Sequence, residues 1–80
     1  MKLKVGDVVE DLCVNLGELG IITKIDKDIS TFDIWIIWEW SLKIWYFCEE
    51  SLEYPEKIKK IERSNKRVRE FKDKVMVENL

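Results

Sequence analysis

Hydrophobic residues are most concentrated in the middle of the chain, where all four tryptophans fall within eleven positions. A membrane-spanning helix needs about 20 predominantly apolar residues. The apolar run at 34–48 is shorter than this, and it is interrupted by Glu39, Ser41 and Lys43. The pattern therefore disfavours a membrane span and predicts two short strands joined by a tight turn.

The two predicted strands occupy 34–39 and 43–48, which are rich in β-branched and aromatic residues. Side chains alternate across a strand, so Ile34, Ile36 and Trp38 should share one face of the sheet. A small, strongly bent barrel can bury one of the two faces, and Trp38 is a candidate for the core. The opposite face is apolar as well, and a helix, a partner or solvent should lie against it.

Three further strands are expected around this hairpin. A first strand should follow a turn at Gly6, with Val5, Val8 and Leu12 pointing inward. A second strand should span 20–25, and a brief last strand should lie at 52–54. The sequence therefore predicts five short strands within about 55 residues.

The C-terminal segment has the composition of a helix. Beyond Pro55 it contains no Gly or Pro and is rich in Lys, Glu and Arg, so we predict a helix that begins at Pro55 or Glu56 and ends near Val75. Apolar residues recur along it at spacings of three, four or seven and form a narrow stripe of Ile58, Ile61, Val68, Phe71 and Val75. This stripe should dock on its own sheet, beside Trp35 or Trp45, or on a neighbouring subunit.

Charge divides the chain, although the net charge is only −2. Residues 1–56 carry five Lys and twelve Asp or Glu, a net −7, whereas residues 57–80 carry nine Lys or Arg and four acids, a net +5. The basic face is either solvated and balanced by intrahelical pairs or in contact with a polyanion. The candidate polyanion contacts are Lys59, Lys60, Arg63, Lys66, Arg67 and Arg69. Nucleic acid is the less favoured partner because the body is acidic and the aromatic and basic residues occupy different segments.

The chain lacks the residue patterns of common catalytic and metal sites. It has no histidine, the commonest general base near neutral pH. Cys13 and Cys48 are far apart and have no CxxC neighbour, so we expect reduced, mostly buried thiols without a zinc site or disulfide. Asp26, Asp28 and Asp33 miss the spacing and the glycine of a calcium loop. We therefore predict no enzymatic activity, no cofactor and no metal.

Several short motifs follow one another along residues 5–54. They are a VGD opening, a GxxGII second strand, a third strand that ends in Trp, and a fourth that passes through WYFCEESLE. The positions that carry them are Gly6, Asp7, Gly17, Gly20, Ile21, Ile36, Trp38, Trp45, Glu49 and Leu52. Together they resemble the small SH3-like barrels encoded by bacteriophages. The resemblance implies a mainly β fold, with a five-stranded SH3-like β-barrel at 1–55 followed by a basic amphipathic C-terminal helix or tail at 56–80.

The turn between the third and fourth strands departs from this family pattern. Similar barrels turn there with Asp-Gly or a like pair, whereas this chain has Trp40, Ser41 and Leu42. Trp40 and Leu42 either fold back over the sheet or the tail, or form an exposed interface patch. The predicted protein-interface residues are Trp35, Trp40, Leu42, Ile61, Val68, Phe71 and Val75.

The resemblance and the surplus apolar surface favour a non-enzymatic structural or adaptor protein of a bacteriophage. Such a protein would attach to a larger protein assembly, such as the virion, and to copies of itself. The alternatives are a nucleic-acid-associated small-barrel module that uses the basic tail, and an inhibitor of a host protein. The N-terminus turns acidic within seven residues and shows no secretory signal, so we expect the host cytoplasm during assembly and the virion afterwards.

Overall fold

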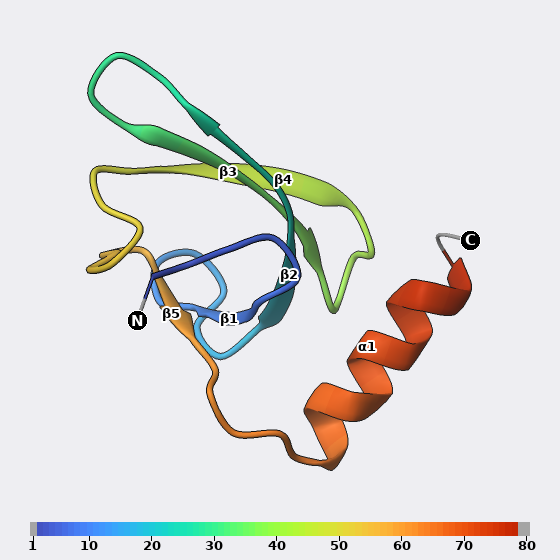
Figure 1. The fold of residues 1–80 in the computed structure, drawn as a ribbon. Helices are drawn as coiled ribbons and strands as arrows, with labels where there is room; N and C mark the ends of the chain where they lie inside the picture. Colours follow the sequence, from blue (N-terminus) through green and yellow to red (C-terminus); the bar gives the residue numbers. More distant parts are fainter. Residues whose placement is uncertain (1, 79–80) are drawn as a thin grey trace.

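The computed structural model describes residues 2–78 and folds them into one antiparallel sheet followed by a helix (Figure 1). The elements are β1 (Val8–Asp11), β2 (Leu19–Lys27), β3 (Phe32–Trp38), β4 (Ile44–Glu49), β5 (Ile58–Lys60) and α1 (Lys66–Glu78). The strand order is β4-β3-β2-β1-β5. A mainly β chain with five strands and a C-terminal helix is thereby confirmed. Within the described residues β4 and β5 do not pair with each other, so the sheet is open and its hydrogen bonds do not close a barrel.

Strands β2, β3 and β4 form a meander whose register sets which side chains face inward. Ile22 pairs with Ile36, the register then shifts, and Lys24 pairs with Trp35. The extra residue at this bulge is Thr23, and a bulge increases the local twist and bends the strand. Ile34, Ile36 and Trp38 lie on the concave side of the curved sheet, where Trp38 is 5% exposed.

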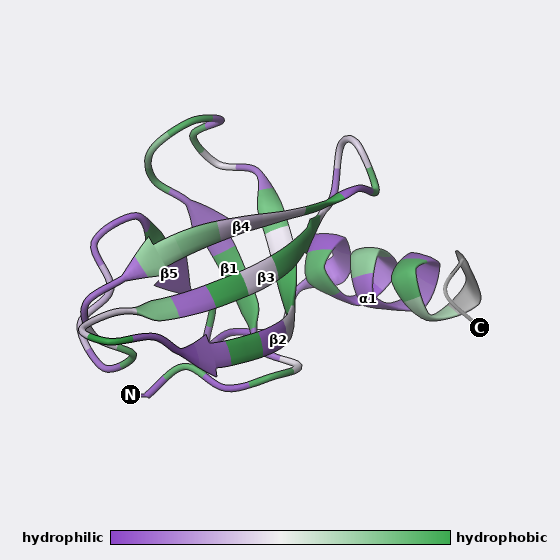
Figure 2. Cartoon of the chain, turned by 90° about the horizontal axis from the view of Figure 1, so that it is seen from above, coloured by the Kyte–Doolittle hydropathy of each residue, from purple (hydrophilic) through white to green (hydrophobic). Residues whose placement is uncertain are grey.

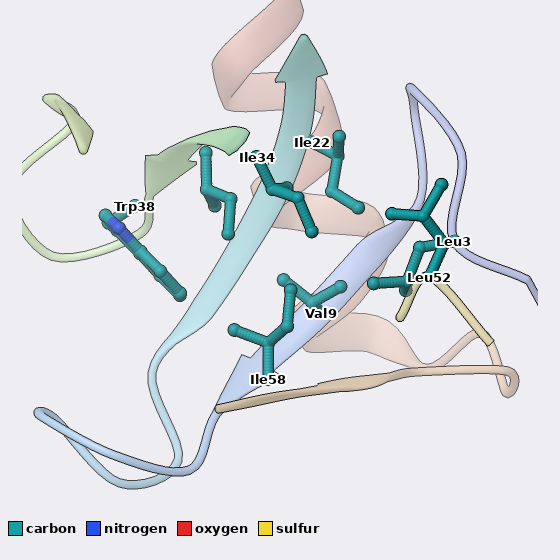
Figure 3. Packing of buried hydrophobic residues seen from close by; sticks show 8 residues of the cluster. Leu3, Val9, Ile22, Ile34, Trp38, Leu52 and Ile58 are labelled. Carbon is teal, nitrogen blue, oxygen red and sulfur yellow. The ribbon is translucent and has the colours of Figure 1, made fainter. Parts of the chain in front are cut away.

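The main core lies between the two halves of the curved sheet (Figure 3). Its buried members are Leu3, Val9, Ile22, Ile34, Ile36, Trp38, Leu52 and Ile58. Gly20 lets the core close over β2, because a Cβ at this position would lie 2.7 Å from a ring carbon of Trp38. Of the two apolar faces of β3, the one that carries Ile34, Ile36 and Trp38 therefore lies in the core.

The predicted last strand at 52–54 is wrong, and the fifth strand lies at Ile58–Lys60 instead. The carboxylate of Glu49 accepts hydrogen bonds from the backbone N–H groups of Glu56 (2.9 Å) and Lys57 (2.8 Å). These bonds organise the intervening residues as a bend rather than a strand. Leu52 still reaches the core, and its carbonyl accepts a hydrogen bond from the N–H of Leu3 at 2.8 Å.

The predicted helix start near residue 55 is also wrong, because α1 begins at Lys66. Residues 58–60 pair with β1, so the sheet extends beyond the expected boundary at 55. Asn65 caps the helix, since its side-chain oxygen accepts the N–H of Val68 at 2.9 Å. Positions 79 and 80 of the predicted tail lie outside the described residues.

Helix α1 docks at one end of the sheet on its convex face (Figure 1 and Figure 2). The second apolar cluster consists of Val8, Leu19, Val68 and Phe71, with Ile21, Leu42, Ile61 and Val75 packed against it. The apolar stripe therefore contacts its own chain, beside β1 and β2 rather than beside Trp35 or Trp45. Val68 and Phe71 are each 3% exposed, so little of their surface is left for another molecule.

Four predictions of burial are wrong. Val5 and Leu12, which were expected to point inward, are exposed. Cys13 and Cys48, which were expected to be mostly buried, are exposed as well, and both thiols are free. Cys13 lies in the loop after β1, where no element covers it. Cys48 lies on β4, an edge strand, and shares its exposed side with Ile44 and Tyr46.

Candidate protein interface: an aromatic groove beside the edge strand

A groove of about 490 Å³ opens between the β1–β2 loop, the β3–β4 turn and strand β4. Its lining residues are Asp11, Val14, Asn15, Glu18, Trp38, Trp40, Ser41, Trp45, Tyr46 and Phe47. Five of these ten residues are aromatic, and we call this hollow the aromatic groove. Apolar grooves with a few polar groups are the usual form of binding sites on small domains.

The aromatic side chains of the groove differ in burial. Trp38 belongs to the core, and its ring meets Phe47 edge to face with centroids 5.8 Å apart. Trp40 and Trp45 are each 62% exposed. The groove therefore has a fixed aromatic floor and two exposed tryptophans that cover little of the protein's own surface.

The β3–β4 turn separates the two apolar side chains that the sequence places at its tip. Leu42 adopts a positive φ of 55°, which costs a residue with a side chain about 1 to 2 kcal/mol. Its side chain packs against the cluster that holds the helix, and this burial offsets the cost. Trp40 stays exposed at the groove. The two alternatives for the tip therefore apply to different residues. Leu42 folds back onto the protein, and Trp40 is exposed.

Two buried carboxylates form the polar wall of the groove. Asp11 is 2% exposed and accepts the backbone N–H groups of Cys13, Val14 and Asn15 at 2.8 to 3.1 Å. Glu18 is 3% exposed and accepts the N–H of Trp40 at 2.9 Å. All of these donors are neutral. Across residues 2–78, neither carboxylate forms an ion pair with Lys or Arg.

Trp35, predicted at the same interface as Trp40, lies on another surface. It pairs with Lys24 on β2 and with Tyr46 on β4. Its ring lies 5.7 Å from that of Tyr46, and Nζ of Lys24 sits 4.8 Å from its centroid. Trp35 is half-buried in this cross-strand row and does not line the aromatic groove.

Three of the six candidate polyanion contacts have acidic partners within their own chain. Arg67 forms an ion pair with Glu39. Lys60 approaches Asp7 at 3.4 Å, and Lys66 approaches Glu70 at 3.9 Å. The remaining three are Lys59, Arg63 and Arg69. Lys59 and Arg63 line two different hollows. None of the six lines the aromatic groove.

The structure shows which groove residues the sequence analysis missed. Trp45, Tyr46, Asp11 and Glu18 were not predicted as site residues. An aspartate before a polar loop is a known signal, because its side chain caps the N–H groups that follow. The exposure of Trp45 has no comparable local signal, since it depends on β4 being at the edge of the sheet.

The described residues offer little reactive chemistry. No group of three Cys, Asp or Glu side chains in residues 2–76 is arranged to hold a metal ion. The thiol of Cys48 donates to Asp33 at 3.1 Å, and this hydrogen bond raises the pKa of the thiol, which makes it a poorer nucleophile at neutral pH. Helix α1, the helix that the described part contains, is too short and too polar to cross a bilayer.

Comparisons with protein-family models, with curated proteins and with solved structures give no significant match.

Proposed function

We propose that this chain is a non-enzymatic interaction module that attaches to a larger protein assembly through the aromatic groove. The observation that carries the proposal is the pair of 62%-exposed tryptophans, Trp40 and Trp45, beside the buried floor of Trp38. Tryptophan is among the residues that most often dominate binding energy at protein interfaces. Exposed aromatic side chains gathered in one hollow are typical of a binding site rather than of a free surface.

The free edge of β4 supports a protein partner. Strand β4 pairs with β3 on one side. The N–H of Trp38 donates to the carbonyl of Lys43, so the backbone carbonyl of Lys43 points toward β3. By alternation, the backbone groups of Ile44 and Tyr46 face away from the sheet. In the described part of the chain no strand covers this side of β4. An extended partner segment could therefore add its backbone to β4 while its side chains enter the groove.

The identity of the assembly rests on the sequence motifs. The antiparallel order β4-β3-β2-β1-β5 is compatible with an SH3-like barrel, and residues 5–54 resemble the small barrels of bacteriophages. We therefore propose an SH3-like barrel that serves as a virion component, in the host cytoplasm during assembly and in the particle afterwards. An inhibitor of a host protein would use the same groove.

Nucleic acid is the weaker candidate partner. Modules that bind single strands combine stacking aromatic rings with basic side chains in one groove. Here the charged residues in the lining of the aromatic groove, Asp11 and Glu18, are both acidic. Arg67 and Lys60 are occupied by acidic partners of their own chain. This distribution favours a protein partner.

A random peptide library displayed on phage and selected on the full chain tests the proposed function. Peptides enriched on the wild type should bind the Trp40→Ser, Trp45→Thr double variant at least about tenfold more weakly, because exposed tryptophans at an interface contribute about 1 to 2 kcal/mol or more each. Arg69→Ala, an exposed change on the helix, is the matched control and should bind like the wild type. Equal binding to the double variant would refute the groove as the interaction site.

A further inference from the structure

We infer that the aromatic groove receives a cationic side chain, arginine above all, from an extended segment of the partner. This inference rests on the proposed function and adds the chemistry that the groove selects. It follows from two independent features of the groove, the charge of its wall and the state of its exposed rings.

The wall of the groove carries negative charge that the chain itself does not neutralise. Asp11 and Glu18 are buried, and the hydrogen bonds they accept come from neutral backbone and amide groups. Neutral donors satisfy the oxygen atoms but leave the net charge in place. Since both carboxylates are buried, their field is screened less than at an open surface. A positive group entering the groove would be attracted by both.

In the described chain, two aromatic rings outside the groove have a lysine ammonium group over their face, whereas Trp40 and Trp45 have none. Nζ of Lys24 lies 4.8 Å from the centroid of Trp35, and Nζ of Lys27 lies 4.3 Å from that of Phe32. Among the described residues no Lys or Arg covers Trp40 or Trp45 in this way. A tryptophan face attracts a cation, and arginine is the commonest partner. The two rings beside the acidic wall are therefore open to a cation from outside.

The same features argue against the other occupants. An acidic or phosphorylated segment would meet the two carboxylates of the wall at close range. A second copy of this chain would bring an acidic body, because residues 1–56 carry a net charge of −7. A purely apolar segment would cover the rings and leave the charges of Asp11 and Glu18 without a counter-ion. A basic segment satisfies the rings and the charges together.

Three matched probes test this inference. They are the blocked pentapeptide acetyl-Gly-Leu-Arg-Leu-Gly-amide and its counterparts with norleucine or glutamate in place of arginine. Each is titrated into the full chain while the indole N–H resonances of Trp40 and Trp45 are followed by NMR. A peptide this short should bind in about the millimolar range. The arginine peptide should bind about tenfold more tightly than the norleucine peptide, and the glutamate peptide should not bind.

Two variants connect the binding to the named features. Glu18→Gln removes one charge and keeps an acceptor for the N–H of Trp40, so it should weaken the arginine peptide and leave the norleucine peptide unchanged. If this buried change unfolds the chain, Trp45→Thr with a salt titration replaces it. The arginine peptide should then bind the wild type more weakly as salt is added. It should also bind Trp45→Thr more weakly than the wild type, because the indole ring of Trp45 is missing.

The outcomes separate the inference from the proposed function. Equal binding of the arginine and norleucine peptides would overturn the cationic inference and leave the groove as an interaction site. If neither peptide shifts Trp40 or Trp45, the inference fails, and the library peptides then decide the proposed function separately. A dimer of the free protein that Trp45→Thr disperses would show that a second copy fills the groove, and it would overturn the inference.

Discussion

Arg67 on α1 and Glu39, the residue directly after β3, form the one ion pair in the described chain that joins the helix to the sheet or its turns. The guanidinium donates to both carboxylate oxygens, with Nε at 3.1 Å from Oε2. It also donates to the carbonyl of Gly17 at 3.0 Å. Glu39 in turn accepts the N–H of Leu19. A single arginine therefore connects the helix, the β1–β2 loop and the β3–β4 turn.

Arg67→Ala should destabilise the chain modestly. The side chain is 51% exposed, so solvent screens the pair, and we expect a loss of about 1 kcal/mol in the free energy of unfolding. Urea unfolding followed by tryptophan fluorescence measures it. Arg69→Ala is the control, because Arg69 is exposed on the same helix and its side chain has no partner in the described residues. Equal losses in the two variants would contradict a specific role for the Arg67–Glu39 pair.

The same pair predicts a dependence on acid. The hydrogen bond from Arg67 lowers the pKa of Glu39 below its usual value of 4.5. A carboxyl whose pKa is lower in the folded state stabilises the fold fully above the unfolded value and loses this contribution as the pH falls through the folded value. The wild type should therefore lose more stability than Glu39→Gln between about pH 5 and pH 3. Parallel pH profiles of the two proteins would exclude this linkage.

The central hairpin could be predicted from local sequence because its signal is local. β-Branched and aromatic residues fill 34–39 and 43–48, and β3 and β4 lie within two residues of these bounds. The start of the helix could not be placed in this way. Residues 58–60 and 66–78 have similar charged and apolar composition, and pairing with β1, a tertiary contact, turns 58–60 into a strand. Asn65 was the local sign of the true start.

The candidate site could be predicted only in part. The run of large side chains at the β3–β4 turn, where a small turn residue is usual, left two alternatives for Trp40, folded back or exposed, and the structure places it exposed at the groove. The alternation of side chains along β4 puts Trp45 on the same face as Phe47. It does not show whether the strand lies at the edge or in the centre of the sheet, so it does not predict that Trp45 is exposed. The surface on which the apolar stripe docks could not be predicted either, because its partners Val8 and Leu19 lie far away in the sequence.

Trp38 and Trp45 should respond oppositely to substitution, although both line the groove. Trp38 is 5% exposed in the core, so Trp38→Ala should cost about 3 to 5 kcal/mol and unfold much of the population at room temperature. Trp45→Thr keeps a β-branched residue on an exposed strand and should change the stability by less than about 1 kcal/mol. Thermal unfolding by circular dichroism compares them. A large loss in Trp45→Thr would make Trp45 part of the core rather than of an interface.

The thiol of Cys48 should react slowly with alkylating agents, although it is exposed. The thiolate is the species that reacts with alkylating agents, and the hydrogen bond to Asp33 holds the pKa of Cys48 above its ordinary value. Asp33→Asn removes the negative charge beside the sulfur, so Cys48 should alkylate several-fold faster in this variant at mildly alkaline pH. Iodoacetamide labelling read by mass spectrometry gives the rate at each cysteine, and Cys13, exposed in the β1–β2 loop, is the internal reference. Unchanged labelling of Cys48 relative to Cys13 would mean that Asp33 does not control the thiol, because only a local effect alters one cysteine and spares the other.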